Sequence, residues 1–340
     1  MSEPIAFLFP GQGSQAVGMG ADAAAASPAA RAVFERADRR LGFALSALCF
    51  QGPEEALKET INAQPAIVAV SLALLAALEE YLAARGAGGR LRPAYVAGHS
   101  VGEYAALVAS GALDLEAALA LVRERGRLMH QEGTACPSGM AAVLGLDDAV
   151  LQEVCAQATE ETLAALGTRV PKHPGMGRVV VANYNSPGQI VLSGEEQALA
   201  RAMELASARG ARRVVALAVS GAFHSPVMEP ASEGLARAVA EAPLGNATIP
   251  LVSNISATPV TEAAALRAEL ARQIVSPVQW IKTIEYLAAQ GVTLFVEIGP
   301  GQVLSGLVKR IVKGATTLNI GAAVEVERVG DELRSRLQDV

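Results

Sequence analysis

One serine stands between two glycines in the stretch GHSVGEYAAL, residues 98–107. A serine hydroxyl becomes a good nucleophile only when a base takes its proton and fixed donors stabilise the charge on the attacked carbonyl oxygen. Residues 98–102 fit G-x-S-x-G, the pattern of a nucleophile elbow, in which the serine lies on a strained turn between a strand and a helix. The apolar run 94–97 and the helical spacing after Glu103 agree with that context. The pattern predicts that Ser100 is catalytic; a chance match in a plain turn is the alternative, because 32 of the 340 residues are glycine.

The general base for this serine must come from four histidines. His99 is adjacent to the nucleophile, and a side chain next in sequence on an elbow points away from it. His130 lies in a charged helical stretch, and His173 lies in the Pro/Gly-rich segment VPKHPGMGR, which predicts an exposed loop. His224 remains, in a turn after an apolar run, where backbone at a strand end can present a side chain to a cleft. We take His224 as the candidate base, with a structural histidine as the alternative.

Composition places the chain among globular proteins and excludes several partner classes. Hydrophobic residues make up 51% and charged residues 18%, which excludes a disordered or fibrous class. The net charge of −6 argues against nucleic acid as a partner, because that affinity depends on neutralising phosphates. The three cysteines form no C-x-x-C pair, so we predict neither a disulfide framework nor a metal site.

No segment predicts membrane association. The longest apolar run, residues 65–78, has 14 residues and contains Ser71, which is too short to cross a bilayer and fits a buried helix. The N-terminal residues lack the positive charges that precede the apolar region of a signal peptide, and the apolar run 5–9 has only five residues. We therefore expect a cytoplasmic protein.

The order of predicted elements indicates an α/β fold with two domains. Helices and strands alternate up to the elbow, which is typical of a parallel sheet. After about residue 134, short β-like runs and two helical patterns follow in a β-α-β-β-α-β order, the ferredoxin-like arrangement; they cover 140–144, 148–166, 179–182, 189–192, 195–208 and 213–217. We predict a large α/β-hydrolase-like domain at 1–133 and 216–340, with a small ferredoxin-like domain inserted at 134–215.

The glycine-rich stretch PGQGSQAVGMG after the first strand resembles a dinucleotide fingerprint but fails its spacing. Gly11 and Gly13 follow the strand, yet the next glycine is Gly18 instead of one three residues on. A second match that begins at Gly18 starts too far from the strand end. Nucleotide binding is therefore not predicted.

Seven motifs, in the same order along the chain, resemble the malonyl-CoA:acyl carrier protein transacylases of bacterial fatty acid synthesis. The resemblance covers about residues 5–312, and the ordered set is far more specific than any one motif. The motifs are FPGQGSQ, GHSVGEYAALVASGAL, RGRLM, NYNSPGQIVLSG, GAFHSPVM, SPVQW and EIGPG.

The resemblance implies a set of catalytic roles. Ser100 would hold the acyl group as an ester, and His224 would take the serine proton and return it to the leaving thiolate. The backbone N–H groups of Gln12 and Val101 would form the oxyanion hole, which fits the rule that the residue after the nucleophile supplies one donor. The sequence shows no acid at a strand-end turn between Ser100 and His224; the family implies that the backbone carbonyl of Gln273 orients the histidine instead.

The resemblance also implies a substrate pocket. Arg125 would pair with the free carboxylate of malonate, since a guanidinium offers two parallel donors that match a carboxylate. Without the family, Arg125 reads as a solvated helical arginine. Gln64 would lie near this site, Asn183 and Asn185 would line the cleft, and the bulk of Phe223 would exclude a 2-methyl group.

The implied substrates are malonyl-CoA and acyl carrier protein, so the coenzyme A thioester is a substrate and no cofactor is expected. The carrier is acidic and binds transiently, and we expect the enzyme to be a monomer. A discrete acyltransferase that serves a polyketide synthase in trans, and a serine hydrolase or thioesterase, are the two alternatives. The basic residues that could dock the carrier are Lys172, Arg178, Arg212, Arg213, Lys309, Arg310 and Lys313.

Overall fold

The computed structural model describes residues 4–87, 92–167 and 171–338. Its main sheet has six strands in the order β10-β9-β1-β2-β7-β8, parallel except where β8 pairs with β7. The strands are β1 (Ile5–Phe9), β2 (Tyr95–Gly98), β7 (Leu251–Val252), β8 (Pro259–Val260), β9 (Leu294–Ile298) and β10 (Thr316–Ile320). The predicted α/β class with a parallel sheet is confirmed.

Helices cover both faces of this sheet, which explains why β1 is apolar at every position. Ile5, Phe7 and Phe9 pack into one hydrophobic cluster, whereas Ala6 and Leu8 pack into another, because successive side chains of a strand point to opposite faces. On the first face lie α1 (Ala21–Ala26), α2 (Pro28–Leu41), α3 (Leu45–Gln51), α4 (Glu54–Lys58), α5 (Thr60–Ala84), α6 (Gly102–Ala109), α7 (Leu115–Ala135), α10 (Glu229–Glu241), α11 (Ala263–Gln273) and α14 (Ala323–Gln338). On the second lie α12 (Trp280–Ala289) and α13 (Val303–Ile311).

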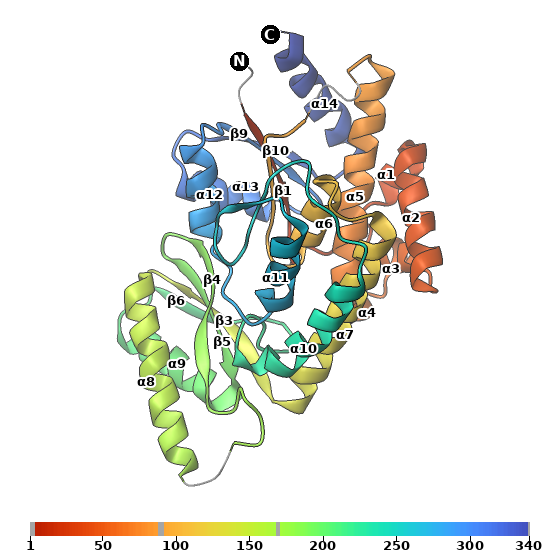
Figure 1. The fold of residues 1–340 in the computed structure, drawn as a ribbon. Helices are drawn as coiled ribbons and strands as arrows, with labels where there is room; N and C mark the ends of the chain where they lie inside the picture. Colours follow the sequence, from red (N-terminus) through yellow and green to blue (C-terminus); the bar gives the residue numbers. More distant parts are fainter. Residues whose placement is uncertain (1–3, 88–91, 168–170, 339–340) are drawn as a thin grey trace.

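Helix α5 contains the apolar run that the sequence assigned to a buried helix. It is longer than that run, and by length and composition alone it could cross a membrane. However, 83% of its most apolar 18-residue window is buried inside the protein. Figure 1 shows α5 between α2 and the main sheet, and most of the apolar side chains of α5 are buried. The prediction of a buried core helix is confirmed.

A separate four-stranded antiparallel sheet forms the lower part of the molecule in Figure 1, with its own hydrophobic core. Its elements follow the predicted β-α-β-β-α-β order: β3 (Ser138–Leu144), α8 (Asp148–Leu166), β4 (Val179–Ser186), β5 (Gln189–Glu195), α9 (Glu196–Ala208) and β6 (Arg213–Ala216). The strand order is β4-β5-β3-β6. These observations support the small domain that we place at 134–215, whose exact limits stay a proposal.

The two sheets meet where β4 passes the segment before α12. The amide of Val278 donates to the carbonyl of Ala182 at 2.8 Å, and the amide of Tyr184 donates to the carbonyl of Val278 at 3.0 Å. Asn183 lies between these two bonds, so its backbone is fixed where the two sheets meet.

Candidate active site

Ser100 occupies the turn that connects β2 to α6. Its φ angle is 52°, in the left-handed region that is strained for a residue other than glycine. A side chain at Gly102 would place Cβ 2.2 Å from the carbonyl oxygen of Phe9, so only glycine lets β1 approach the turn this closely. The predicted strand, strained turn and helix are therefore present around Ser100.

Asn254, at the end of β7, holds this turn in place. Its Oδ1 accepts a hydrogen bond from the Ser100 amide at 2.8 Å, and its Nδ2 donates to the Gly98 carbonyl at 2.7 Å. Sequence reasoning did not identify Asn254, although its position shortly after the apolar run at residues 249–252 was the available signal. A strained turn persists only where surrounding contacts determine it, and these two bonds supply that constraint.

His224 faces the serine hydroxyl and is itself held by backbone carbonyls. Its Nε2 lies 2.8 Å from Ser100 Oγ, and its Nδ1 lies 2.9 Å from the carbonyl oxygens of both Gln273 and Ser276. Since a carbonyl only accepts, we assign the proton to Nδ1, which leaves Nε2 free to accept the serine proton. The carbonyl of Gln273 was expected from the family resemblance; that of Ser276 was not.

The imidazole of His224 is neutral over the physiological pH range. Burial, followed by the positive charge of Arg125, lowers its pKa to about 3. A neutral ring is the form that can act as a base, so the site is ready to remove the Ser100 proton without first losing one.

Arg125 projects from α7 to the same place and is only 1% exposed, which rules out the solvated arginine that its sequence context suggested. Its Nη1 donates to Gln64 Oε1 at 2.7 Å, while its Nη2 donates to Gln273 Oε1 at 2.9 Å and to Ser100 Oγ at 3.0 Å. Among the described residues no carboxylate forms an ion pair with Arg125, and its Nε has no partner there.

A pocket of about 90 Å³ opens over these three side chains. The loop that carries Gln12 closes one side of it, and Gly11 permits this approach, because a Cβ there would lie 2.6 Å from the His99 carbonyl oxygen. In the described part of the chain the amides of Gln12 and Val101 donate no hydrogen bond, so both are free for an incoming oxygen. The lining residues are Gln12, His99, Ser100, Val101, Arg125, Met129, Met140, Asn183, Leu217, Val219, Phe223 and His224.

Not all of the residues expected at the cleft line it in the same way. Asn183 and Phe223 line the pocket directly, and the buried Asn183 Oδ1 has no partner within the described residues. Gln64 is fully buried and reaches the site only through Arg125. Asn185 lies beside the pocket, with Oδ1 2.8 Å from His99 Nε2.

The other histidines do not reach Ser100. The His99 ring turns away as expected and packs against Trp280, with ring centroids 5.4 Å apart. The expectation of an exposed His173 is wrong: its side chain is 12% exposed, with Nε2 3.1 Å from Glu132 Oε2, because the loop folds back onto α7. Val170, at the start of that loop, lies outside the described residues.

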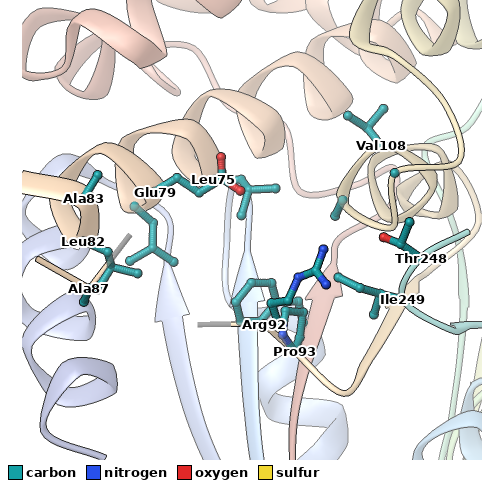
Figure 2. A pocket seen from close by; sticks show the side chains of 14 residues that line it. Leu75, Glu79, Leu82, Ala83, Ala87, Arg92, Pro93, Val108, Thr248 and Ile249 are labelled. Atoms are coloured by element: carbon teal, nitrogen blue, oxygen red, sulfur yellow. The ribbon is translucent and has the colours of Figure 1, made fainter. Parts of the chain in front are cut away.

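A larger cavity, of about 580 Å³, lies away from the site. It opens where Arg92 and Pro93 lead into β2 and where Thr248 and Ile249 lead into β7, with Glu79 of α5 on its other side (Figure 2). These are the amino ends of the strands, whereas Ser100 follows the carboxyl end of β2. Reacting groups in parallel sheets gather at the carboxyl ends, so the small pocket is the candidate site.

Known proteins match almost the whole length of this chain. The family model of the acyl transferase domain matches residues 6–329. The malonyl CoA-acyl carrier protein transacylase of Bacillus subtilis (strain 168) is 42% identical over 324 residues, which cover 95% of each chain. The solved acyl-carrier-protein-S-malonyltransferase of Bartonella henselae is 39% identical with a TM-score of 0.88, covering 97% of this chain and 99% of that one. A malonyl-transacylase solved in complex with a type II PKS acyl-carrier protein is 37% identical with a TM-score of 0.84, covering 99% and 100%.

Proposed function

We propose a mechanism for this chain, which belongs to the acyl transferase family, among the malonyl CoA-acyl carrier protein transacylases. It transfers the malonyl group from malonyl-CoA to acyl carrier protein for fatty acid synthesis. The observation that carries this assignment is the buried guanidinium of Arg125, whose Nη2 lies 3.0 Å from Ser100 Oγ. A cation so close to the nucleophile fits an acyl group that carries its own carboxylate, as malonyl does.

In the first half-reaction, Ser100 Oγ attacks the thioester carbonyl of malonyl-CoA while His224 Nε2 takes the hydroxyl proton. The negative charge on the carbonyl oxygen is received by the backbone N–H groups of Gln12 and Val101. When the carbon–sulfur bond breaks, the imidazolium returns its proton to the leaving thiolate of coenzyme A. The malonyl group is then an ester on Ser100.

The second half-reaction reverses these roles with a new thiol. The phosphopantetheine thiol of the carrier gives its proton to His224 and attacks the ester carbonyl. The carbon–oxygen bond to Ser100 breaks, and Oγ takes the proton back from the imidazolium. Because one group serves both steps and coenzyme A leaves before the carrier reacts, we expect ping-pong kinetics.

The remaining pocket residues bind the acyl group. Arg125 pairs with the malonyl carboxylate, and Gln64 holds Arg125 from its other side. Phe223 limits the space beside the reacting carbon. The Oδ1 of Asn183, which has no partner within the described residues, is available to a donor on the substrate. Asn185 contacts His99 and so supports the wall of the pocket.

Intact-mass analysis after incubation with malonyl-CoA tests the nucleophile. We expect the mass of one malonyl group on the wild-type protein and none on Ser100→Ala. The cysteines are internal controls, because burial raises the pKa of Cys49 and of Cys155 to about 12 and makes both thiols poor nucleophiles. An adduct that persists in Ser100→Ala, or that maps to a cysteine, would show that Ser100 is not the nucleophile.

Several further statements belong to the proposal. We propose that the enzyme works in the cytoplasm as a monomer, that its contact with the acidic carrier is transient, and that it needs no cofactor or metal. Size-exclusion chromatography coupled to light scattering tests the oligomeric state. Dialysis against a chelator should leave malonyl transfer unchanged.

The basic residues suggested for carrier docking are exposed, but they do not form one patch. Arg310 Nη1 donates to Gln189 Oε1 at 2.5 Å. Leu144 of β3 is the register partner of Gln189 on β5 and of Arg213 on β6. Arg310 and Arg213 therefore lie at one end of the four-stranded sheet. Arg178 directly precedes β4 and lies at the opposite end. A carrier that docks at the end with Arg213 and Arg310 leaves the end with Arg178 free.

Charge reversal distinguishes the two groups. One variant changes Arg212, Arg213 and Arg310 to Glu, and the other changes Lys172 and Arg178 to Glu. Reversal of the true docking group should raise KM for the carrier, more strongly at low salt, and leave KM for malonyl-CoA as it was. Equal KM values for the carrier in both variants and the wild type would exclude both groups.

The two alternatives lead to different outcomes. A polyketide role has the support of the solved relative that is in complex with a type II PKS acyl-carrier protein; genes adjacent to this one, and kcat/KM for carriers of each type, separate it from fatty acid synthesis. A hydrolase should release free malonate faster than it transfers malonyl to a carrier, and it would give Arg125 no evident task.

A further inference from the structure

Arg125 is a buried cation that has no direct counter-ion among the residues that the structure describes. Its desolvation is unfavourable, and a buried charge normally requires a partner of opposite sign. The proposed substrate supplies a carboxylate only while it is bound. The guanidinium must therefore be stabilised in the free enzyme by groups that leave room for that carboxylate.

The side chain of Gln273 supplies one such contact and connects it to an acid. Its Oε1 accepts from Arg125 Nη2 at 2.9 Å, and its Nε2 donates to Glu103 Oε2 and, at 3.1 Å, to the Ser100 carbonyl. Because a guanidinium only donates, the amide can have only this orientation. Gln273 is fully buried at the end of α11, so these contacts determine its conformation.

Glu103 is the buried acid at the other end of this chain of contacts. Its Oε1 accepts from the Asn254 amide at 3.0 Å, while its Oε2 accepts from Gln273. Burial and the neighbouring Glu269 raise the pKa of Glu103, whereas its N–H donors favour the charged form. Both oxygens act as acceptors, which is the pattern of a carboxylate.

We infer that Gln273, through its side chain, is a positioning residue that links the Glu103 carboxylate to Arg125 and so prepares the guanidinium for the malonyl carboxylate. This inference rests on the proposed function. The amide dipole directs its oxygen to the cation and its N–H to the anion, so it stabilises Arg125 without placing a carboxylate on it. A glutamate in direct contact with Arg125 would compete with the substrate for the same donors.

Gln64 provides a matched comparison within the same site. It also accepts from Arg125, at 2.7 Å, but its Nε2 faces the sulfur of Met129 at 3.3 Å instead of a carboxylate. Both glutamines thus give Arg125 one amide oxygen, and only Gln273 carries a connection to an acid. Replacing each of them by Met removes the amide at nearly constant volume and keeps the backbone carbonyl of Gln273 that holds His224.

The experiment measures kcat/KM for malonyl-CoA and acetyl-CoA in the wild type, Gln273→Met, Gln64→Met and Glu103→Gln. We expect the malonyl-to-acetyl ratio to fall at least tenfold in Gln273→Met, mainly through KM for malonyl-CoA, and several-fold less in Gln64→Met. Glu103→Gln should shift the ratio in the same direction as Gln273→Met, although Glu103 touches neither Arg125 nor the pocket. The ratio cancels any loss of folded enzyme.

Three results would overturn the inference: equal losses for both thioesters in Gln273→Met, an equal shift of the ratio in Gln64→Met, or an unchanged ratio in Glu103→Gln. A wild type that does not prefer malonyl-CoA would instead contradict the proposed function. Thermal unfolding of each variant identifies a fold defect, and a soluble variant with a low melting temperature is assayed below that temperature.

Discussion

Replacing Arg125 by Ala should change which thioester the enzyme uses. In the wild type the guanidinium is buried, and its Nη2 lies 3.0 Å from Oγ of Ser100, the proposed nucleophile. The carboxylate of a bound malonyl group therefore sits where water cannot replace the lost partner. The variant leaves that carboxylate desolvated and unpaired, whereas an acetyl group has no carboxylate to lose and gains space.

The size of the effect follows from the burial of the pair. Removing one partner of a buried ion pair costs about 2 to 5 kcal/mol. Since about 1.4 kcal/mol corresponds to a factor of ten, kcat/KM for malonyl-CoA should fall by roughly 30-fold to 4000-fold. We expect the upper part of this range, because Arg125 is only 1% exposed.

The assay follows formation of the acyl-enzyme and transfer to a carrier for both thioesters, in the wild type, Arg125→Ala and Arg125→Lys. Arg125→Lys should recover only part of the loss, since an ammonium keeps the charge but not the two parallel donors. The malonyl-to-acetyl ratio should collapse or invert in Arg125→Ala. Equal losses for the two thioesters would refute this reasoning and show that Arg125 supports the fold instead of binding the substrate.

Three further predictions concern single contacts. His224 has a folded-state pKa of about 3 and an unfolded pKa of about 6.5, so between these values the unfolded chain binds the proton and the folded one does not. The unfolding free energy therefore decreases as the pH is lowered through this range. His224→Gln should make that decrease smaller between pH 6.5 and 5 in urea titrations, and an unchanged slope would contradict a buried, neutral His224. Phe223→Ala should raise the methylmalonyl-to-malonyl ratio of kcat/KM about tenfold or more, since one methyl group is worth about 1 to 3 kcal/mol, and no rise would show that Phe223 does not exclude the methyl group. Asn254→Ala should lower stability by about 1 to 3 kcal/mol in denaturant titrations and slow acylation, whereas Asn254→Asp, which keeps the acceptor for the Ser100 amide, should slow it less.

The sequence predicted those parts of the fold and site that depend on local pattern. The alternation of helix and strand led to both sheets, and the predicted helix at 148–166 matches α8 at both ends. The G-x-S-x-G pattern correctly predicted the strained turn at Ser100, because the glycines and the serine that form this turn all lie within five consecutive residues. Elimination among four histidines led to the ring that contacts Ser100 Oγ.

Contacts between distant segments could not be predicted in the same way. Asn254 and Ser100 are 154 positions apart, and Gln273 and Arg125 are 148 positions apart. No periodicity or spacing relates such pairs, and only the folded sheet brings the ends of β2, β7 and α11 together. Arg125 is the clearest case: its helical context indicates a solvated side chain, while the fold buries it against two glutamines.

The way in which His224 is held explains why this site is suited to transfer. Two backbone carbonyls accept from Nδ1, and among the described residues no carboxylate does. A carboxylate would stabilise the imidazolium and so strengthen the histidine as a base toward water, which is a poor acid. A thiol is far more acidic and needs a weaker base. The two carbonyls favour the imidazolium, but burial and the nearby charge of Arg125 outweigh them and lower the pKa of His224. The ester on Ser100 should therefore react readily with the carrier thiol and slowly with water.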